Sequence, residues 1–298
     1  MDRYYFSVGS VIIDDIVLPD GQTHMGVLGG GATHAAMGMR VWSEQVGLVS
    51  SVGEDFSEEH RKELASAFDL QGLVCYGTPT ARAWQVFEAD GQRTEVFRTD
   101  FEEFLVNAPS PEQLPGAYDN ARGVHLLSGV PELFLDWVKV LRLRGIELIL
   151  WEPWDIYCQP ENRAEFRHLL PLVDVFSPNL TEARHITGQM DVEQAAKALL
   201  SYGAKCVTIR MGENGSLIAD NEGRLHSIPA VQPDKLVDVT GAGNAYCGGF
   251  IVGFSETGDS LTAGQYGSVS ASLALEQYGA VYRMTNLREK AQARLSRF

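Results

Sequence analysis

The sequence predicts an α/β protein in which helices cover both faces of a mostly parallel sheet. From Gly123 onward, short β-branched runs alternate with longer segments of helical periodicity, and this alternation is typical of a parallel sheet. Two further pairs of runs, at residues 12–27 and 83–99, enclose turn residues and predict hairpins. A long small-residue run after Asn244 predicts a buried, tightly packed helix.

Composition and charge exclude several classes of protein. The 298 residues suffice for one large domain, and no linker divides residues 1–298. The formal charge of −15 argues against nucleic acid or an anionic membrane surface as the main partner. The four cysteines are far apart and form no Cys-x-x-Cys pair, which indicates reduced thiols in a cytoplasmic protein. The N-terminus lacks the pattern of a signal peptide, and no apolar run approaches about 18 residues, so we expect no membrane span.

The first apolar run, residues 5–13, is interpreted as one strand that ends at Asp14 and Asp15. Ligands of α/β proteins usually bind at the carboxyl ends of the strands. Asp14 therefore either contacts a ligand or only caps a loop, and a ligand role for Asp15 has less support. Residues 16–27 then predict a hairpin around Pro19-Asp20-Gly21.

Three glycines, Gly29, Gly30 and Gly31, open a small-residue helix that we expect to end near residue 42. Glycines allow backbone to approach a ligand closely, but they serve simple tight packing equally well. His34 is expected to be a packing or capping residue, because no second histidine or cysteine lies at metal-ligand spacing.

The remaining elements follow from periodicity and turn residues. The hairpin at residues 83–99, around Asp90-Gly91, joins the one at 12–27 in a small β lid over one end of the sheet. Residues 101–119 are acidic and proline-containing, and we expect a surface segment there. The other predicted strands are residues 46–52, 74–78, 124–128, 146–151, 173–177, 206–211 and 216–219, and the other predicted helices are 57–68, 132–144, 162–170, 181–187, 192–203 and 261–278.

Two later segments have both a structural and a functional interpretation. Asn179, followed three residues later by Glu182, is a capping-box arrangement at a helix start. The same side chains would equally serve to hold Mg²⁺ or phosphate through water. Arg210 to Gly215 end a strand in a glycine-containing turn, which taken alone is an ordinary hairpin.

The segment Asp238-Val239-Thr240-Gly241-Ala242-Gly243-Asn244 is the most informative stretch of the sequence. A glycine-rich turn that opens a buried helix leaves backbone N–H groups without partners and directs them at one point. The helix dipole adds partial positive charge, so this point suits a phosphate or a developing oxyanion. An ordinary loop that enters a helix is the alternative.

Taken together, the motifs resemble the PfkB or ribokinase family of carbohydrate kinases. The resemblance covers almost the whole chain in order, through Gly9 with Asp14, Gly29 to Ala36, Gly47 to Phe56, Ser177-Pro178-Asn179 with Glu182, Gly212 with Gly215, Asp238 to Tyr246, and Gly279-Ala280. The step Trp151-Glu152-Pro153 and the Gly-Ala-Gly-Asn variant further resemble a divergent branch of the family known from fungi.

The resemblance implies a ribokinase-like three-layer α/β/α sandwich with a lid, and ATP-dependent phosphorylation of a hydroxyl on a sugar, sugar alcohol or nucleoside. It assigns site residues as follows: Gly241, Ala242 and Gly243 as the anion hole; Asp14, Gly30, Gly31 and Thr33 at the substrate; Asn179, Glu182, Arg210, Gly212, Gly215 and Thr240 at the nucleotide and phosphates; Glu182 at Mg²⁺ through water; and Asp238 in a loop for a monovalent cation such as K⁺. It also implies a homodimer that pairs through the lid.

Three residues depart from the family pattern. Asn244 stands where the family has an aspartate that takes the proton of the attacking hydroxyl. An amide is no base at neutral pH, and loss of general-base catalysis typically lowers a rate by ~10²–10⁴. Thr33 stands where many members have a substrate-binding asparagine, and Arg210 replaces the usual threonine.

These departures leave three hypotheses open: a kinase that is slow or has its base at another position, a ligand-binding pseudo-kinase, and an interaction scaffold with an emptied site. Asp15 is a conceivable substitute base, whereas Asp238 is a poor one because the resemblance gives it a cation-loop role. The sequence alone does not separate natural divergence at Asn244 from a substitution made to trap a complex.

Overall fold

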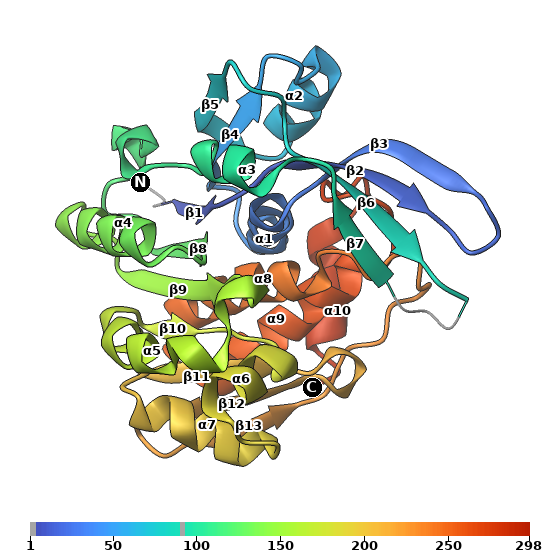
Figure 1. Ribbon diagram of the computed structural model, residues 1–298. Helices are drawn as coiled ribbons and strands as arrows, with labels where there is room; N and C mark the ends of the chain where they lie inside the picture. The colour runs from blue at the N-terminus through green and yellow to red at the C-terminus, as the bar shows by residue number, and fades with distance from the viewer. Residues whose placement is uncertain (1–3, 90–92) are drawn as a thin grey trace.

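The computed structural model describes residues 4–89 and 93–298 (Figure 1). The first three residues, and with them part of the N-terminal segment assessed for a signal peptide, lie outside these ranges, as does the predicted hairpin turn at Asp90-Gly91. Within them, the main sheet has nine strands, and all pairs are parallel except those that join β12 to its neighbours β11 and β13. In sheet order the strands are β13 (Leu225–Ile228), β12 (Ser216–Asp220), β11 (Cys206–Arg210), β10 (Val175–Phe176), β9 (Leu148–Pro153), β8 (Gly123–Ser128), β1 (Tyr5–Val8), β4 (Val46–Gly53) and β5 (Asp69–Tyr76).

Helices cover both faces of this sheet and bury one hydrophobic cluster on each (Figure 1). One face carries α1 (Gly31–Arg40), α2 (Glu58–Ala65), α8 (Ala242–Thr257), α9 (Ser260–Ala274) and α10 (Leu287–Leu295). The other carries α4 (Pro131–Leu143), α5 (Arg163–Leu169), α6 (Leu180–Thr187) and α7 (Val192–Ser201). The predicted three-layer sandwich is confirmed. In the described part of the chain, no helix has the length and apolar character that a membrane span requires.

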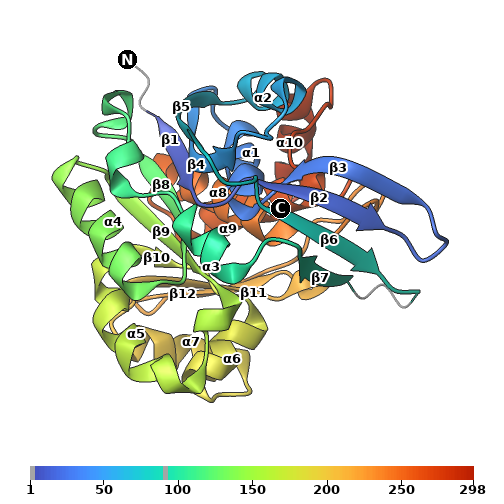
Figure 2. The same ribbon diagram turned by 45° about the horizontal axis from the view of Figure 1, so that its top comes forward.

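A second, four-stranded sheet forms the lid, which projects beyond one edge of the sandwich (Figure 2). Its strands, in sheet order, are β3 (Thr23–Gly29), β2 (Ile12–Val17), β6 (Arg82–Phe87) and β7 (Arg93–Phe97). The central pair, β2 and β6, is parallel, and both outer pairs are antiparallel. The lid therefore consists of the two predicted hairpins side by side.

The prediction of one strand over residues 5–13 was wrong. The chain leaves the main sheet after β1 and enters the lid as β2, with Gly9 and Ser10 at the break. Both strands are buried, so their apolar residues form one run in the sequence. As a result Asp14 and Asp15 lie within a lid strand and not at the end of a main-sheet strand.

Other differences are smaller. The segment 101–119, expected to lie on the surface, contains α3 (Phe101–Val106), which Asp100 caps, and it also buries Leu114 and Tyr118. Helix α10 and strand β13 were not predicted: α10 is a mostly charged and polar segment, and β13 has only four residues, of which only Ile228 is buried. The predicted strands and helices between residues 123 and 220 are confirmed with boundaries shifted by up to two residues.

Helices α1 and α8 pack with almost no side chain between them. A Cβ atom at Gly38 would lie 2.1 Å from the carbonyl oxygen of Ala245, and one at Gly248 would lie 1.9 Å from that of Ala35. Backbone therefore contacts backbone at this crossing, which brings the first turns of the two helices together beneath the lid.

Candidate active site

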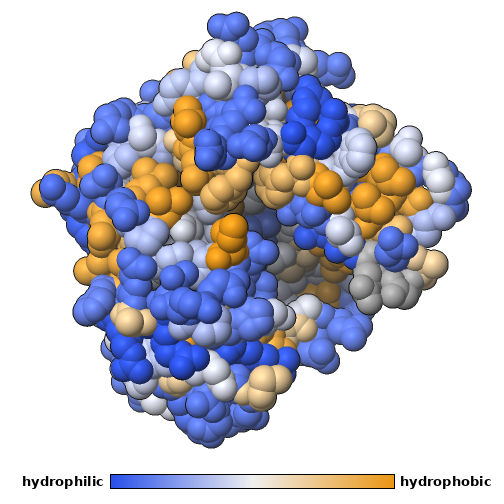
Figure 3. Space-filling model, viewed as in Figure 1, coloured by the Kyte–Doolittle hydropathy of each residue, from blue (hydrophilic) through white to orange (hydrophobic). Residues whose placement is uncertain are grey.

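A cleft of about 780 Å³ lies between the lid and the sandwich, and Figure 3 shows the molecular surface hollowed at this place. Its walls come from lid strands β2, β6 and β7, the starts of α1, α6 and α8, and the carboxyl end of β9. The predicted site residues that line it are Asp14, Gly30, Gly31, Asn179, Glu182, Thr240, Gly241 and Asn244. Segments from four distant parts of the sequence thus meet at one site.

The other predicted site residues do not line the cleft: Thr33, Arg210, Gly212, Gly215, Asp238, Ala242 and Gly243. Thr33, assigned to the substrate, is fully buried in α1, and its hydroxyl has no hydrogen-bond partner among the described residues. The next residue, His34, lines the cleft instead. Since consecutive residues of a helix point about 100° apart, only one of the two can face the cleft.

Gly241 shapes the start of α8. It is the N-cap residue, it has a left-handed φ of 73°, and no side chain caps the helix. A Cβ atom at Gly241 would lie 2.1 Å from Cγ of His34. Both the backbone conformation and the packing therefore require glycine here. Because no side chain caps the helix, the N–H groups of its first turn can turn to a ligand, and of these Ala242 has a long hydrogen bond of 3.5 Å to the carbonyl of Val239.

His34 supports this turn from beneath. The residue is buried, and neither ring nitrogen has a hydrogen-bond partner in the described structure. Burial, with a contribution from the positive charge of Arg93, lowers the pKa of His34 to about 4. The imidazole is therefore neutral at physiological pH and has one N–H donor and one acceptor nitrogen that other residues do not use.

The lid contributes a polar chain that sequence reasoning missed, which runs from the buried Asp14 and Gln85 to the exposed Arg93 and Glu95. Nε2 of Gln85 donates to Oδ1 of Asp14 at 2.9 Å and to Oε1 of Glu95 at 2.8 Å, and Arg93 donates to Oε1 of Gln85 at 2.9 Å. Burial raises the pKa of Asp14 to about 7. The alternation of β6 and β7 places these three partners on one face of the lid, and that periodicity was the available signal.

Asp15 has a different role from the one considered for it. Its carboxylate accepts the backbone N–H of Gly26 at 2.8 Å and pairs with Arg98 of the lid. It does not line the cleft. Asp15 therefore fastens the strands of the lid to each other, and it is not a substitute base.

The capping box at the start of α6 is confirmed. The side chain of Asn179 accepts the N–H of Glu182 at 2.9 Å, and Oε2 of Glu182 accepts the N–H of Asn179 at 2.7 Å. Burial raises the pKa of Glu182 to about 7, although the nearby Arg210 opposes this rise. Both residues also line the cleft. The amide nitrogen of Asn179 donates to Oε1 of Glu182 at 2.6 Å, so each carboxylate oxygen of Glu182 already has one partner within the box.

A carboxylate that sequence reasoning left without a role, Glu152, lies directly beside Asn244. The amide nitrogen of Asn244 donates to Oε2 of Glu152 at 3.0 Å. His125 Nε2 contacts the same oxygen at 2.7 Å, and Arg210 Nη1 lies 2.5 Å from Oε1. Burial by itself would raise the pKa of Glu152, but Arg210 and His125 outweigh it and bring the pKa to about 2.

Arg210, predicted at the nucleotide, instead points inward. A Cβ atom at Gly243 would lie 2.5 Å from its Nη1, so the guanidinium packs under the first turn of α8. Its Nη2 donates to the carbonyl of Ser177 at 2.9 Å and lies 3.9 Å from Oε2 of Glu182. The positive charge is therefore buried beneath the anion site and does not line it.

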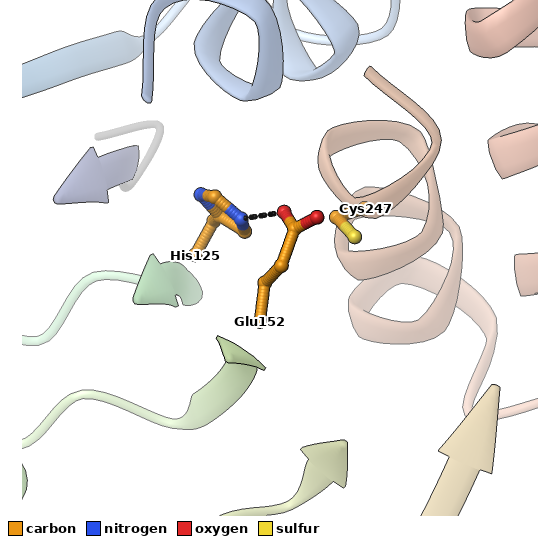
Figure 4. A group of neighbouring side chains, drawn as sticks. All are labelled: His125, Glu152 and Cys247. Carbon is orange, nitrogen blue, oxygen red and sulfur yellow. Dashed lines mark hydrogen bonds and ion pairs between the residues drawn. The ribbon is translucent and has the colours of Figure 1, made fainter. Parts of the chain in front are cut away.

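Among the described residues, His125, Glu152 and Cys247 bring three potential metal ligand atoms within 4.8 Å of one another (Figure 4). The side chains do not suit a cation as they are arranged. Glu152 already binds the cationic Arg210, and burial raises the pKa of the Cys247 thiol, which keeps it protonated. A thiol must lose its proton to bind a metal.

Comparisons with known proteins agree with this geometry. Residues 2–286 match the family of proteins described as pfkB family carbohydrate kinase. A cytidine kinase of Thermococcus kodakarensis is 31% identical over 250 residues, which cover 83% of this chain and 87% of the relative. An uncharacterised protein of Schizosaccharomyces pombe is 27% identical over 317 residues, with 93% of this chain and 86% of the relative covered.

The fold has matches among solved structures. A putative ribokinase II of E. coli in complex with ATP and Mg²⁺ superposes with a TM-score of 0.77 at 19% identity, over 100% of both chains. This likeness shows the ribokinase-like fold. With the match over residues 2–286 and the cleft between lid and sandwich, it follows that this chain belongs to the PfkB family of carbohydrate kinases.

Proposed function

We propose that the protein is an ATP-dependent phosphotransferase that acts on a hydroxyl of a small sugar, sugar alcohol or nucleoside. The observation that carries the proposal is the shared cleft, where the uncapped first turn of α8 faces the same space as Asp14. The wall formed by the start of α8 offers N–H donors and the positive end of the helix dipole. The opposite wall offers the carboxylate of Asp14, which can accept hydrogen bonds from substrate hydroxyls. Phosphoryl transfer depends mainly on positioning and charge stabilisation, which these walls supply.

The phosphate side is assigned to α8 and α6. The N–H groups of Gly241, Ala242 and Gly243 at the start of α8 would hold the transferred phosphoryl group. Of this segment, Thr240 and Gly241 line the cleft. Asn179 and Glu182 would hold Mg²⁺ through water, and the ion would neutralise charge that develops on the phosphates. The raised pKa of Glu182 fits this assignment, since a nearby cation would favour its ionised form.

The nucleotide would extend along the turn after β11. Gly212 has open space around it, and Gly215 holds the turn against the backbone of Ile228. Asp238, which accepts the N–H of Thr240 at 2.8 Å, would shape a loop for a monovalent cation such as K⁺. Turnover that is equal in potassium and choline salts would remove the cation from this scheme.

The acceptor side is assigned to the lid and to the start of α1. Asp14 would accept hydrogen bonds from substrate hydroxyls, and the backbone of Gly30 and Gly31 would approach the same molecule. Gln85 and Arg93 hold Asp14 in place and close the cleft from above. A small polyhydroxylated molecule fits a volume of about 780 Å³.

The test is ADP formation from ATP and Mg²⁺ with a broad panel of sugars, sugar alcohols and nucleosides. We expect turnover with at least one compound, and Asp14→Asn should reduce it. Asp220→Asn is the matched control, since Asp220 is also buried but pairs with Arg224 at the far hairpin. Absence of turnover with every compound, in the chain as it is, in Asn244→Asp, and in Asn244→Asp combined with Glu152→Gln, would refute a kinase.

A second candidate is a nucleotide- or sugar-binding pseudo-kinase, and Asn244 is the observation that favours it. This function predicts that Mg²⁺–ATP or an acceptor raises the Tm while ADP formation stays undetectable. Robust turnover by the unaltered chain would exclude it, and absence of any ligand-induced Tm change would leave only a scaffold role.

We also propose a homodimer that pairs through the outer face of the lid. Trp84 and Val96 are cross-strand neighbours that are 45% and 44% exposed, and they alternate with the residues that face the cleft. Light scattering should give twice the chain mass, and Trp84→Glu should halve it. Leu143→Glu, at an exposed apolar residue of α4, is the matched control. A monomeric mass for the unaltered chain would refute the dimer.

A further inference from the structure

We propose that Glu152 is the base that accepts the proton of the substrate hydroxyl, in place of the carboxylate that is missing at position 244. This inference rests on the proposed kinase function. It assigns a catalytic role to a residue of β9, whereas the family resemblance points to the first turn of α8. The negative charge of the site is then retained, but strand β9 supplies it in place of helix α8.

The position of Glu152 supports this role. It is the penultimate residue of β9, it lines the cleft, and it touches the side chain of Asn244 at 3.0 Å. Asparagine and aspartate have nearly the same shape, so a hydroxyl that would reach an aspartate at position 244 comes close to Glu152. No other carboxylate described in the structure contacts Asn244.

The orientation of Asn244 follows from its partner. An ionised carboxylate only accepts hydrogen bonds, so the NH₂ group of Asn244 must face Glu152, and its oxygen must point away. The amide oxygen can then accept a hydrogen bond from the incoming hydroxyl and hold it, but it cannot keep the proton. The acid–base work is left to Glu152.

The surroundings keep Glu152 ionised and in place. Arg210 binds Oε1, and His125 and Asn244 both bind Oε2. Ser7 contacts Nδ1 of His125 at 2.8 Å and, as the donor there, leaves the proton of the ring on Nε2, where it faces Glu152.

Oε2 of Glu152 thus has two hydrogen-bond donors, whereas Oε1 pairs with Arg210. The protonated Cys247 thiol also lies beside the carboxylate, and it donates to Oγ of Ser177 at 3.2 Å. The incoming proton is therefore assigned to Oε1, the oxygen with fewer hydrogen-bond partners among the described residues.

The proton transfer balances as follows. The hydroxyl oxygen forms a bond to the γ-phosphorus, and the bond from that phosphorus to the β–γ bridging oxygen breaks, so that ADP leaves with the electron pair. The hydroxyl proton passes to Oε1 of Glu152 and is released to solvent after the product leaves. In a loose transition state the hydroxyl loses its proton late, when it has become acidic, so a weakly basic carboxylate suffices.

The contact between Glu152 and Asn244 makes an unusual prediction about Asn244→Asp. As the only substitution, this change would place two carboxyl groups about 3 Å apart, and two carboxyl groups at that distance cannot both be ionised. Restoring the family residue alone should therefore not improve the enzyme. It should do so only when Glu152 is replaced by its neutral isostere.

The experiment compares four proteins: the unaltered chain, Glu152→Gln, Asn244→Asp, and the double variant. We expect Glu152→Gln to lower kcat at least 100-fold while KM for ATP and the Tm increment from Mg²⁺–ATP change less than twofold. Asn244→Asp should not raise kcat at pH 7, and its pH–rate profile should shift to higher pH. The double variant should recover at least tenfold over Glu152→Gln.

Controls keep the outcomes distinct. Asp220→Asn should leave kcat within twofold. If Glu152→Gln does not fold, Glu152→Asp keeps the charge beside Arg210 and should still lower kcat more than tenfold, because the carboxylate retreats by one methylene. A Glu152→Gln enzyme within threefold of the unaltered chain, or an Asn244→Asp enzyme that is faster than it, would overturn the proposal.

The two proposals fail in different ways. Turnover in the double variant, without turnover in the unaltered chain, would overturn Glu152 as the base and leave the kinase site intact. Absence of turnover in all four proteins, despite a Tm increment from Mg²⁺–ATP, would overturn the kinase function as well.

Discussion

A methyl group at Gly241 should damage both the stability of the protein and its anion site. The left-handed φ of 73° disfavours any residue with a Cβ atom, by roughly 1–2 kcal/mol. The new Cβ would also lie 2.1 Å from Cγ of His34, and that buried ring has little room to move. Overpacking of this kind costs about 1–3 kcal/mol. We expect Gly241→Ala to lower the free energy of unfolding by about 2–5 kcal/mol in total.

Urea unfolding followed by tryptophan fluorescence measures this loss. Gly223→Ala is the matched control, because Gly223 has a left-handed φ of 84° and no atom within 4 Å of its built Cβ. The control should lose only the backbone part, roughly 1–2 kcal/mol. Mg²⁺–ATP should raise the Tm of the control as it does in the unaltered chain, but not that of Gly241→Ala. Equal losses in the two variants would show that His34 does not confine Gly241.

Three further predictions concern buried groups. Because the pKa of Asp14 is about 7, kcat/KM for the acceptor should rise as pH increases through 7. Asp14→Asn should abolish this rise and lower the plateau of kcat/KM by about 10–100-fold, and a rise that persists in the variant would mean that another group titrates. The folded pKa of His34 is about 4 against an ordinary 6.5, so the unfolded chain binds more protons between these pH values, and stability falls by about 3 kcal/mol as pH drops from 6.5 to 4. The difference in unfolding free energy between the unaltered chain and His34→Leu should follow this curve, and a difference that is constant with pH would contradict it. Gly248→Ala should lose at least about 1–3 kcal/mol, since its Cβ would meet the carbonyl of Ala35; an unchanged Tm would argue against the close helix crossing.

The parts of the fold that could be predicted are those where one physical pattern holds over a whole element. Between Gly123 and residue 210 each parallel strand is buried on both faces and helices α4 to α7 are buried on one, so apolar runs and periodicity mark them clearly. Helix α8 is buried on all sides, and its run of small residues marked it instead. The prediction of one strand over residues 5–13 was wrong for a related reason: burial on both faces gives an unbroken apolar run, whichever sheet the strand belongs to. Periodicity identifies a strand, but it does not tell which sheet the strand joins.

The candidate site divides in a similar way. Gly241 and Asp14 could be proposed from the sequence, because a glycine turn before a helix and a carboxylate next to an apolar run are local patterns. Glu152 also follows an apolar strand, and the same reasoning applied there could have singled it out. Its contacts with Arg210 and Asn244 could not be predicted, since they join three elements that only the folded sheet brings together.

The backbone contact between α1 and α8 has a consequence for how this enzyme can change its substrate. Gly38 and Gly248 leave no side chain between the helices, so the spacing between the acceptor side of the cleft and the phosphate side is set by main-chain atoms. Lid residues such as Gln85 and Arg93 can be exchanged without altering that spacing. The choice of molecule is thereby uncoupled from the distance over which the phosphoryl group travels, and engineering of specificity should begin in the lid.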